Sequence, residues 1–70
     1  MRLWAVYLGG HLAADRIGED HELVFVVADE VEAAKKAAKK KWRGVGRAHV
    51  DAIRSVDEVD GYVVSVSQRS

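Results

Sequence analysis

The residues best suited to chemistry are three histidines that lie near carboxylates along the chain. The histidines are His11, His21 and His49, and the nearby acids are Asp15, Glu19, Asp20, Glu22 and Asp51. Imidazole is the commonest protein ligand of a metal ion, and beside a carboxylate it can also act as an acid or base. His49 and Asp51 are two residues apart, which places them on one face of an extended strand. The spacing matches no metal motif, so surface or structural histidines are the simpler interpretation.

A second feature is a basic stretch that contains no acid. Its charged residues are Lys35, Lys36, Lys39, Lys40, Lys41, Arg43 and Arg47, with Trp42 among them. Such a stretch resembles the electrostatic footprint of a nucleic-acid-binding protein. The whole chain, however, has 11 basic and 11 acidic residues, whereas a duplex binder usually carries net positive charge. A solvated helix end, rich in helix-favouring Ala and Lys, is therefore the simpler interpretation.

The elements that must position these residues belong to one small domain, residues 1–70. The composition, 49% hydrophobic and 31% charged, is that of a globular chain. There is no Cys, which excludes disulfides, thiolate metal sites and cysteine nucleophiles and favours the cytoplasm. No apolar run approaches the roughly 18 residues of a membrane span, and no secretory signal pattern is present. We expect no cofactor and no membrane contact.

Local sequence patterns predict four strands and one helix. Two apolar runs, 3–8 and 23–28, predict strands that are separated by a polar loop over 11–22. Asp29 suits the N-cap of a helix that ends near Arg43, because Gly44 suits the position after a helix. Asp60-Gly61 predicts a type I′ hairpin between a third strand, 49–59, and a fourth, 62–67. The expected fold is α+β, a four-stranded largely antiparallel sheet with one helix on one face, in the order β-β-α-β-β.

The single predicted helix can cover only one of the two faces of the predicted sheet. Both early strands are apolar on both faces, the pattern of strands that are covered on both sides. No element of the chain remains to cover the second face, so a second copy packed sheet to sheet is the economical solution. We therefore expect a homodimer whose sheet face includes Trp4, Val6, Leu8, Val24 and Val26.

Five short blocks resemble, in order, a small bacterial family known only as a domain of unknown function, DUF1543. They are 3–10, 19–22 ahead of the strand at 24–27, Trp42, 49–51 and 59–62. The resemblance spans residues 1 to about 66 and departs from the family pattern at Asp20 and Arg43. Longer family members can carry the domain twice, which would suit a sheet face that needs a second copy.

The resemblance implies no reaction, substrate or cofactor. It does single out His21, Glu22, His49 and Asp51, which match the polar parts of the family pattern, as candidate ligand-binding residues. We expect a small homodimeric assembly or binding module without catalysis. One alternative is a polar pocket at the dimer that binds a metal ion or small anion through those four residues. The other is a nucleic-acid accessory that uses the basic helix end.

Overall fold

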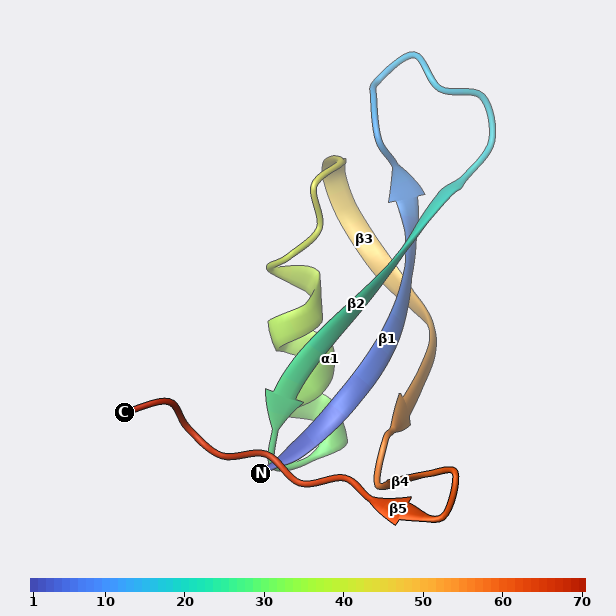
Figure 1. The fold of residues 1–70 in the computed structure, drawn as a ribbon. Helices are drawn as coiled ribbons and strands as arrows, with labels where there is room; N and C mark the ends of the chain where they lie inside the picture. Colours follow the sequence, from blue (N-terminus) through green and yellow to red (C-terminus); the bar gives the residue numbers. More distant parts are fainter.

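The computed structural model describes residues 1–70 and contains five strands and one helix (Figure 1). Their order is β1 (Arg2–His11), β2 (Asp20–Ala28), α1 (Val31–Lys39), β3 (Val45–Ser55), β4 (Glu58–Val59) and β5 (Tyr62–Val63). β1 is the central strand of a three-stranded antiparallel sheet of order β2-β1-β3, and β4 and β5 form a separate hairpin. The α+β class is confirmed.

The prediction of one four-stranded sheet is wrong, because the third predicted strand is interrupted at residues 56–57. The last backbone hydrogen bond between this segment and the sheet is donated by the Val56 amide to the Leu3 carbonyl. The Asp57 carboxylate is then held by Arg2, at 2.8 Å, and by the Ser55 hydroxyl, also at 2.8 Å. These side-chain contacts fix the point where the chain leaves the sheet, so β4 and β5 pair only with each other.

The hydrophobic core lies between the sheet and α1. Its buried members are Trp4, Val6, Leu8, Val24, Val26, Ala28, Ala34, Ala38 and Ala48. The helix contributes only alanines to this core, and their small side chains let α1 approach the strands closely. The indole nitrogen of Trp4 donates to the Ala28 carbonyl at 3.0 Å, so this buried polar group is satisfied.

This core corrects the predicted dimer face. Trp4, Val6, Leu8, Val24 and Val26 all point toward α1 and are at most 9% exposed, so they do not lie on an open face. Side chains alternate across a strand, and the opposite face therefore carries the residues between them. We call that opposite surface the convex face and define it by Ala5, Tyr7, Leu23, Phe25, Val27 and Ala52.

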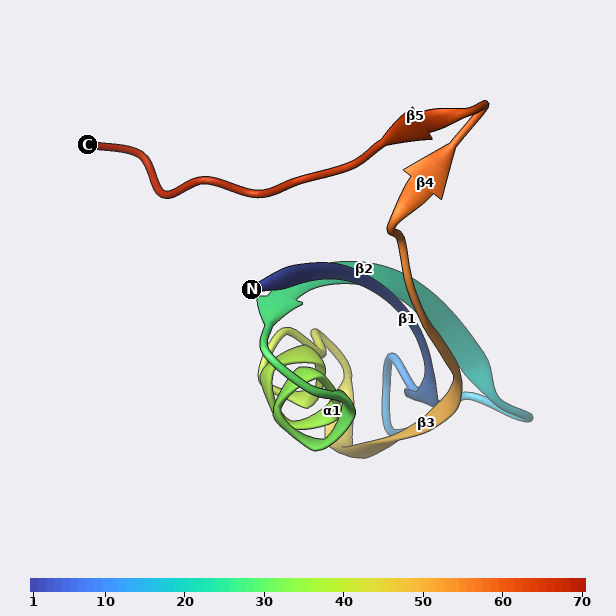
Figure 2. The same cartoon turned by 90° about the horizontal axis from the view of Figure 1, so that it is seen from below.

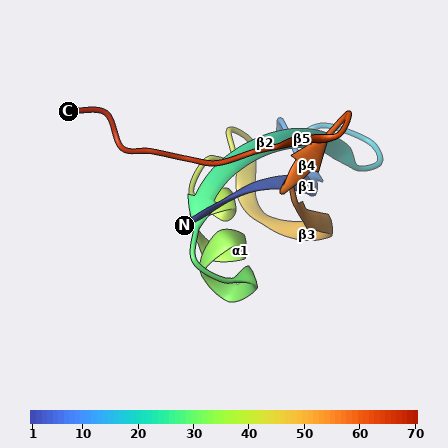
Figure 3. The same ribbon diagram turned by 60° about the horizontal axis from the view of Figure 1, so that its bottom comes forward.

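The sheet curves around α1, and the end of the chain lies on the other side of the sheet. Figures 2 and 3 show α1 on the concave side, with β4, β5 and the C-terminal segment beyond the convex side. We call residues 56–70 the arm. No helix of the structure is long and apolar enough to cross a membrane.

The helix begins and ends at other residues than the sequence predicted. Glu30 is the N-cap, and its carboxylate accepts hydrogen bonds from the amides of Glu32 and Ala33 at 3.0 and 2.8 Å. Asp29 instead pairs with the amino terminus at 3.2 Å. The helix ends at Lys39, before the predicted Arg43, and a turn leads to Gly44. Gly44 is needed there because a Cβ would clash with Trp42 and with the His11 carbonyl.

The hairpin between β4 and β5 confirms the turn prediction. Asp60 and Gly61 both have positive φ, 54° and 82°, as a type I′ turn requires. Val59 is paired with Tyr62 across the turn, in the predicted register. The strands are only two residues long each, so most of the predicted fourth strand has no partner strand in the chain.

Candidate histidine–carboxylate site

The candidate site lies on the convex side of the sheet, above Gly9 of β1. Gly9 is paired with His21 of β2 on one side and with His49 of β3 on the other, so the two histidines flank it. A Cβ on Gly9 would come within 2.7 Å of an oxygen of Asp51 and within 2.7 Å of an oxygen of Glu19. The missing side chain thus leaves the space in which two carboxylates lie.

A β-bulge in β3 brings Asp51 to this face. Tyr7 is paired with Ala52 and Leu8 with Val50, which leaves Asp51 as the extra residue of the bulged strand. Val50 faces the core with Leu8, so the residues on either side of it, His49 and Asp51, both lie on the convex side. Bulges re-aim side chains in this way at functional sites.

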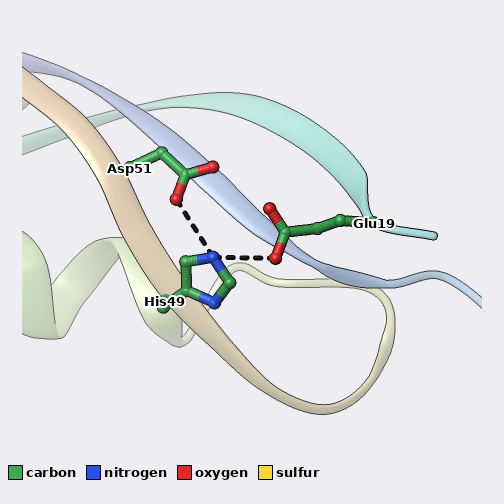
Figure 4. A group of neighbouring side chains, drawn as sticks. All are labelled: Glu19, His49 and Asp51. Atoms are coloured by element: carbon green, nitrogen blue, oxygen red, sulfur yellow. Dashed lines mark ion pairs between the residues drawn. The ribbon is translucent and has the colours of Figure 1, made fainter.

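Two carboxylates and two imidazoles form a closed ring of contacts. Nε2 of His21 lies 3.1 Å from Oε1 of Glu19 and 2.8 Å from Oδ2 of Asp51. Nε2 of His49 lies 2.9 Å from Oε2 of Glu19 and 3.0 Å from Oδ1 of Asp51 (Figure 4). Each Nε2 faces two oxygens yet carries at most one hydrogen. We call Glu19, His21, His49 and Asp51 the histidine–carboxylate cluster.

The cluster is held from one side and open on the other. The ring of Tyr7 is stacked on the ring of His21, with centroids 4.9 Å apart and planes 3° from parallel, which fixes the imidazole plane. The four side chains of the cluster are between 30% and 56% exposed. None of them lines any of the four cavities of the molecule. An open site of this kind suits an ion better than an organic substrate, which needs a concave pocket.

Three of the four residues expected to bind a ligand come together, and Glu22 does not. Glu22 is paired with Leu8 on the helix side of the sheet, and Arg43 contacts its Oε2 at 2.6 Å. Its other carboxylate oxygen is buried without a hydrogen-bond partner. The fourth member of the cluster is Glu19, which sequence reasoning left out of the candidate set. The signal that points to Glu19 is the two-residue period of a strand. If the predicted strand 23–28 is extended toward the N-terminus, Glu19 and His21 lie on the same face.

The loop before β2 is closed by Asp20. The Arg16 side chain donates hydrogen bonds to its carboxylate, and the Leu12 amide donates another at 3.0 Å. Hydrogen bonding from Arg16, followed by that from Leu12, lowers the pKa of Asp20 from 3.8 to about 2. Asp20 therefore ties the two ends of the loop together, next to Glu19.

The basic stretch does not form one free patch. Lys35 pairs with Glu32 at 3.4 Å, Lys41 donates to the Phe25 carbonyl, and Arg43 binds Glu22. The remaining basic residues of the stretch form no ion pair: Lys36, Lys39, Lys40 and Arg47. Nucleic-acid binding by this stretch stays a prediction.

Comparison with known families decides what the chain is related to. Residues 16–66, more than half of the sequence, match the family described as Domain of Unknown Function (DUF1543). The chain belongs to the DUF1543 family. The matched part of this DUF1543 chain contains all four members of the histidine–carboxylate cluster, whereas β1 with Gly9 precedes it. No curated protein and no solved structure matches the chain.

Proposed function

We propose that this DUF1543 domain binds one divalent transition-metal ion, zinc in the first place, at the histidine–carboxylate cluster. The observation that carries the proposal is the convergence of two imidazole nitrogens and two carboxylates on the space above Gly9. Oxygen or nitrogen atoms of Glu19, His49 and Asp51 lie within 4.8 Å of one another, close enough to share one ion.

The distances within the cluster suit an ion that enters between the side chains. Nitrogen and oxygen ligands lie about 2.0–2.2 Å from zinc, so neighbouring ligands of a tetrahedral site are about 3.4 Å apart. Each Nε2 lies 2.8–3.1 Å from its two carboxylate oxygens, slightly closer than that spacing. The four side chains are partly exposed, so they have room to move apart and admit an ion.

The donor chemistry favours a cation and, among cations, a borderline one. Imidazole suits zinc, iron, copper and nickel, while carboxylates suit these and harder ions such as manganese. Two carboxylates repel an anion, so the small-anion alternative is disfavoured at this place. Glu19, His49 and Asp51 are the three side chains whose ligand atoms lie close enough to share one ion, and His21 contacts both carboxylates beside them. The proposal is a metal-binding module.

The test is zinc binding by isothermal titration calorimetry on the metal-free protein, with stoichiometry checked by elemental analysis. We expect one zinc per chain. His21→Ala and His49→Ala should each weaken binding by more than the roughly 10–100-fold that loss of a second-shell partner causes. His11→Ala is the matched control, because His11 is the last residue of β1 and makes no contact with the cluster.

Gly9→Ala tests the same site without removing a ligand. The new Cβ would force both carboxylates away, while the φ of Gly9 lies outside the positive region that would strain alanine. We expect a folded variant, by circular dichroism, with zinc affinity lowered at least about tenfold. Absence of zinc binding by the wild type, or equal losses in His11→Ala and His49→Ala, would overturn the proposal.

A further inference from the structure

The convex face is an apolar surface without a cover. Tyr7, Leu23, Phe25 and Val27 are each between 42% and 55% exposed, and they are adjacent across β1 and β2. Two of these residues, Tyr7 and Leu23, also line a shallow cavity of about 170 Å³ together with Ala5 and Ala52. Contiguous apolar surfaces of this kind mark interaction sites in water-soluble domains.

The surface of the chain is larger than that of a compact domain of its mass. The accessible surface is 5390 Å², whereas a compact monomer of 7.7 kDa exposes about 4,300 Å². The radius of gyration is 13.7 Å, against about 11 Å for a compact domain of this length. The excess, about 1,000 Å², is close to the roughly 800 Å² that each partner buries in a standard interface.

The arm pairs with no strand of the three-stranded sheet, and beyond the β4–β5 hairpin it is unpaired. The Val64 amide donates to the Asp57 carbonyl, and residues 65–70 then make no backbone hydrogen bond. Val64 and Val66 are half-buried and alternate with exposed serines, as in a strand with one apolar face. Unpaired strand-like backbone of this kind readily pairs with another chain.

The arm meets its own sheet at the end where β1 begins, first through the bonds of Val56 to Leu3 and of Asp57 to Arg2 and then at the corner beside Met1. Val66, Ser67 and Gln68 border a cavity of about 430 Å³ whose other walls are Met1 and Val27. Figures 2 and 3 show the C-terminal segment running from β5 along the convex side and continuing past the N-terminus. Neither β4 nor β5 pairs with a strand of the three-stranded sheet. The arm therefore leaves most of its own convex face uncovered.

We propose that a second copy of this chain covers the convex face, and that the two copies exchange arms. Each arm would swing at residues 56–57 and bring Val64 and Val66 onto the partner's convex face, where Val66 would meet Val27. The exchange is reciprocal, so one two-fold axis covers both apolar faces and leaves no open end. The occupant is a second copy because the arm and the face it would fill have matching apolar chemistry, and because the excess area is close to one partner's share of a standard interface.

Single cysteines test the exchange, since the chain has no Cys of its own. Val27→Cys and Val66→Cys proteins, one of them carrying a tag, are mixed, refolded together and oxidised. We expect a disulfide-linked product that contains both proteins, because the arm of one copy lies on β2 of the other. A double variant that closes its disulfide within one chain, with no cross-linked product from the mixture, would overturn the exchange.

The oligomeric state tests the convex face. Native mass spectrometry of the wild type should give a dimer, and Phe25→Glu should give a folded monomer. Ile17→Glu is the matched control, because Ile17 is fully exposed in the loop and should leave the dimer intact. A wild type that is monomeric at every concentration, or a dimeric Phe25→Glu, would overturn the proposal. Zinc binding by Phe25→Glu should be unchanged, so the outcome is independent of the proposed metal site.

Discussion

Among single residues, Asp20 has the ionisation that is most clearly coupled to the fold. The hydrogen bonds from Arg16 and from the Leu12 amide lower the pKa of Asp20 to about 2, below its ordinary value of 3.8. A carboxyl with a depressed pKa in the folded state contributes stability that is fully present above its unfolded pKa. That contribution is lost as the pH falls from about 4 to about 2.

We therefore expect Asp20→Asn to flatten the pH dependence of the melting temperature in this range. The wild type should lose stability more steeply between pH 4 and pH 2 than the variant, measured by circular dichroism melts. Asp15→Asn is the matched control, because Asp15 lies in the same loop and forms no ion pair. Equal slopes for the wild type and Asp20→Asn would show that the loop closure does not contribute.

The cluster shows how far single residues could be predicted. His49 and Asp51 were expected on one face because strand side chains alternate, and the structure places them there. The predicted ligand-binding residues include Glu22 and not Glu19, although neighbouring strand residues point to opposite faces and Glu22 follows His21 directly. The decisive contribution of Gly9 was beyond sequence reasoning, because it depends on which strands lie on either side of β1.

At the scale of elements, the start of α1 can be tested by one pair of substitutions. Glu30 caps two amides with its carboxylate, whereas Asp29 only pairs with the amino terminus on the surface. Loss of an N-cap side chain lowers stability by about 1 kcal/mol. We expect that loss in Glu30→Ala and a change within about 0.5 kcal/mol in Asp29→Ala, from urea unfolding at equal protein concentration. A larger loss in Asp29→Ala would place the cap at Asp29.

The elements were predictable where local signals act alone. The apolar runs identified β1 and β2, and Asp60-Gly61 identified the turn, because positive φ at both positions requires such residues. The single four-stranded sheet failed because the chain leaves the sheet at Asp57, which is held by Arg2 from the far end of the sequence. The bulge at Asp51 likewise depends on pairing with β1 and has no local signal.

At the scale of the whole molecule, stability and recognition are divided between the two faces of one sheet. The helix side holds every buried hydrophobic residue, and only 11 of 70 residues are buried in total. The convex side holds the histidine–carboxylate cluster at the loop end and the uncovered apolar surface beside it. A sheet of three strands thus uses one face to fold and leaves the other open, where we propose that a metal ion and a second copy bind.

So small a core predicts that one side chain accounts for a large share of the folding free energy. Leu8 is 0% exposed, and it is one of only two large side chains that are fully buried. Leu8→Ala should lower the free energy of unfolding by about 3 kcal/mol, through lost burial and the cavity left behind. A chain of this length has about 4–10 kcal/mol in all, so the urea midpoint of the variant should fall by a third or more. Leu12→Ala, at a position 45% exposed in the loop, is the matched control and should stay within about 0.5 kcal/mol of the wild type. Equal losses at the two leucines would mean that the stability of the fold does not come from the packing of α1 on the sheet.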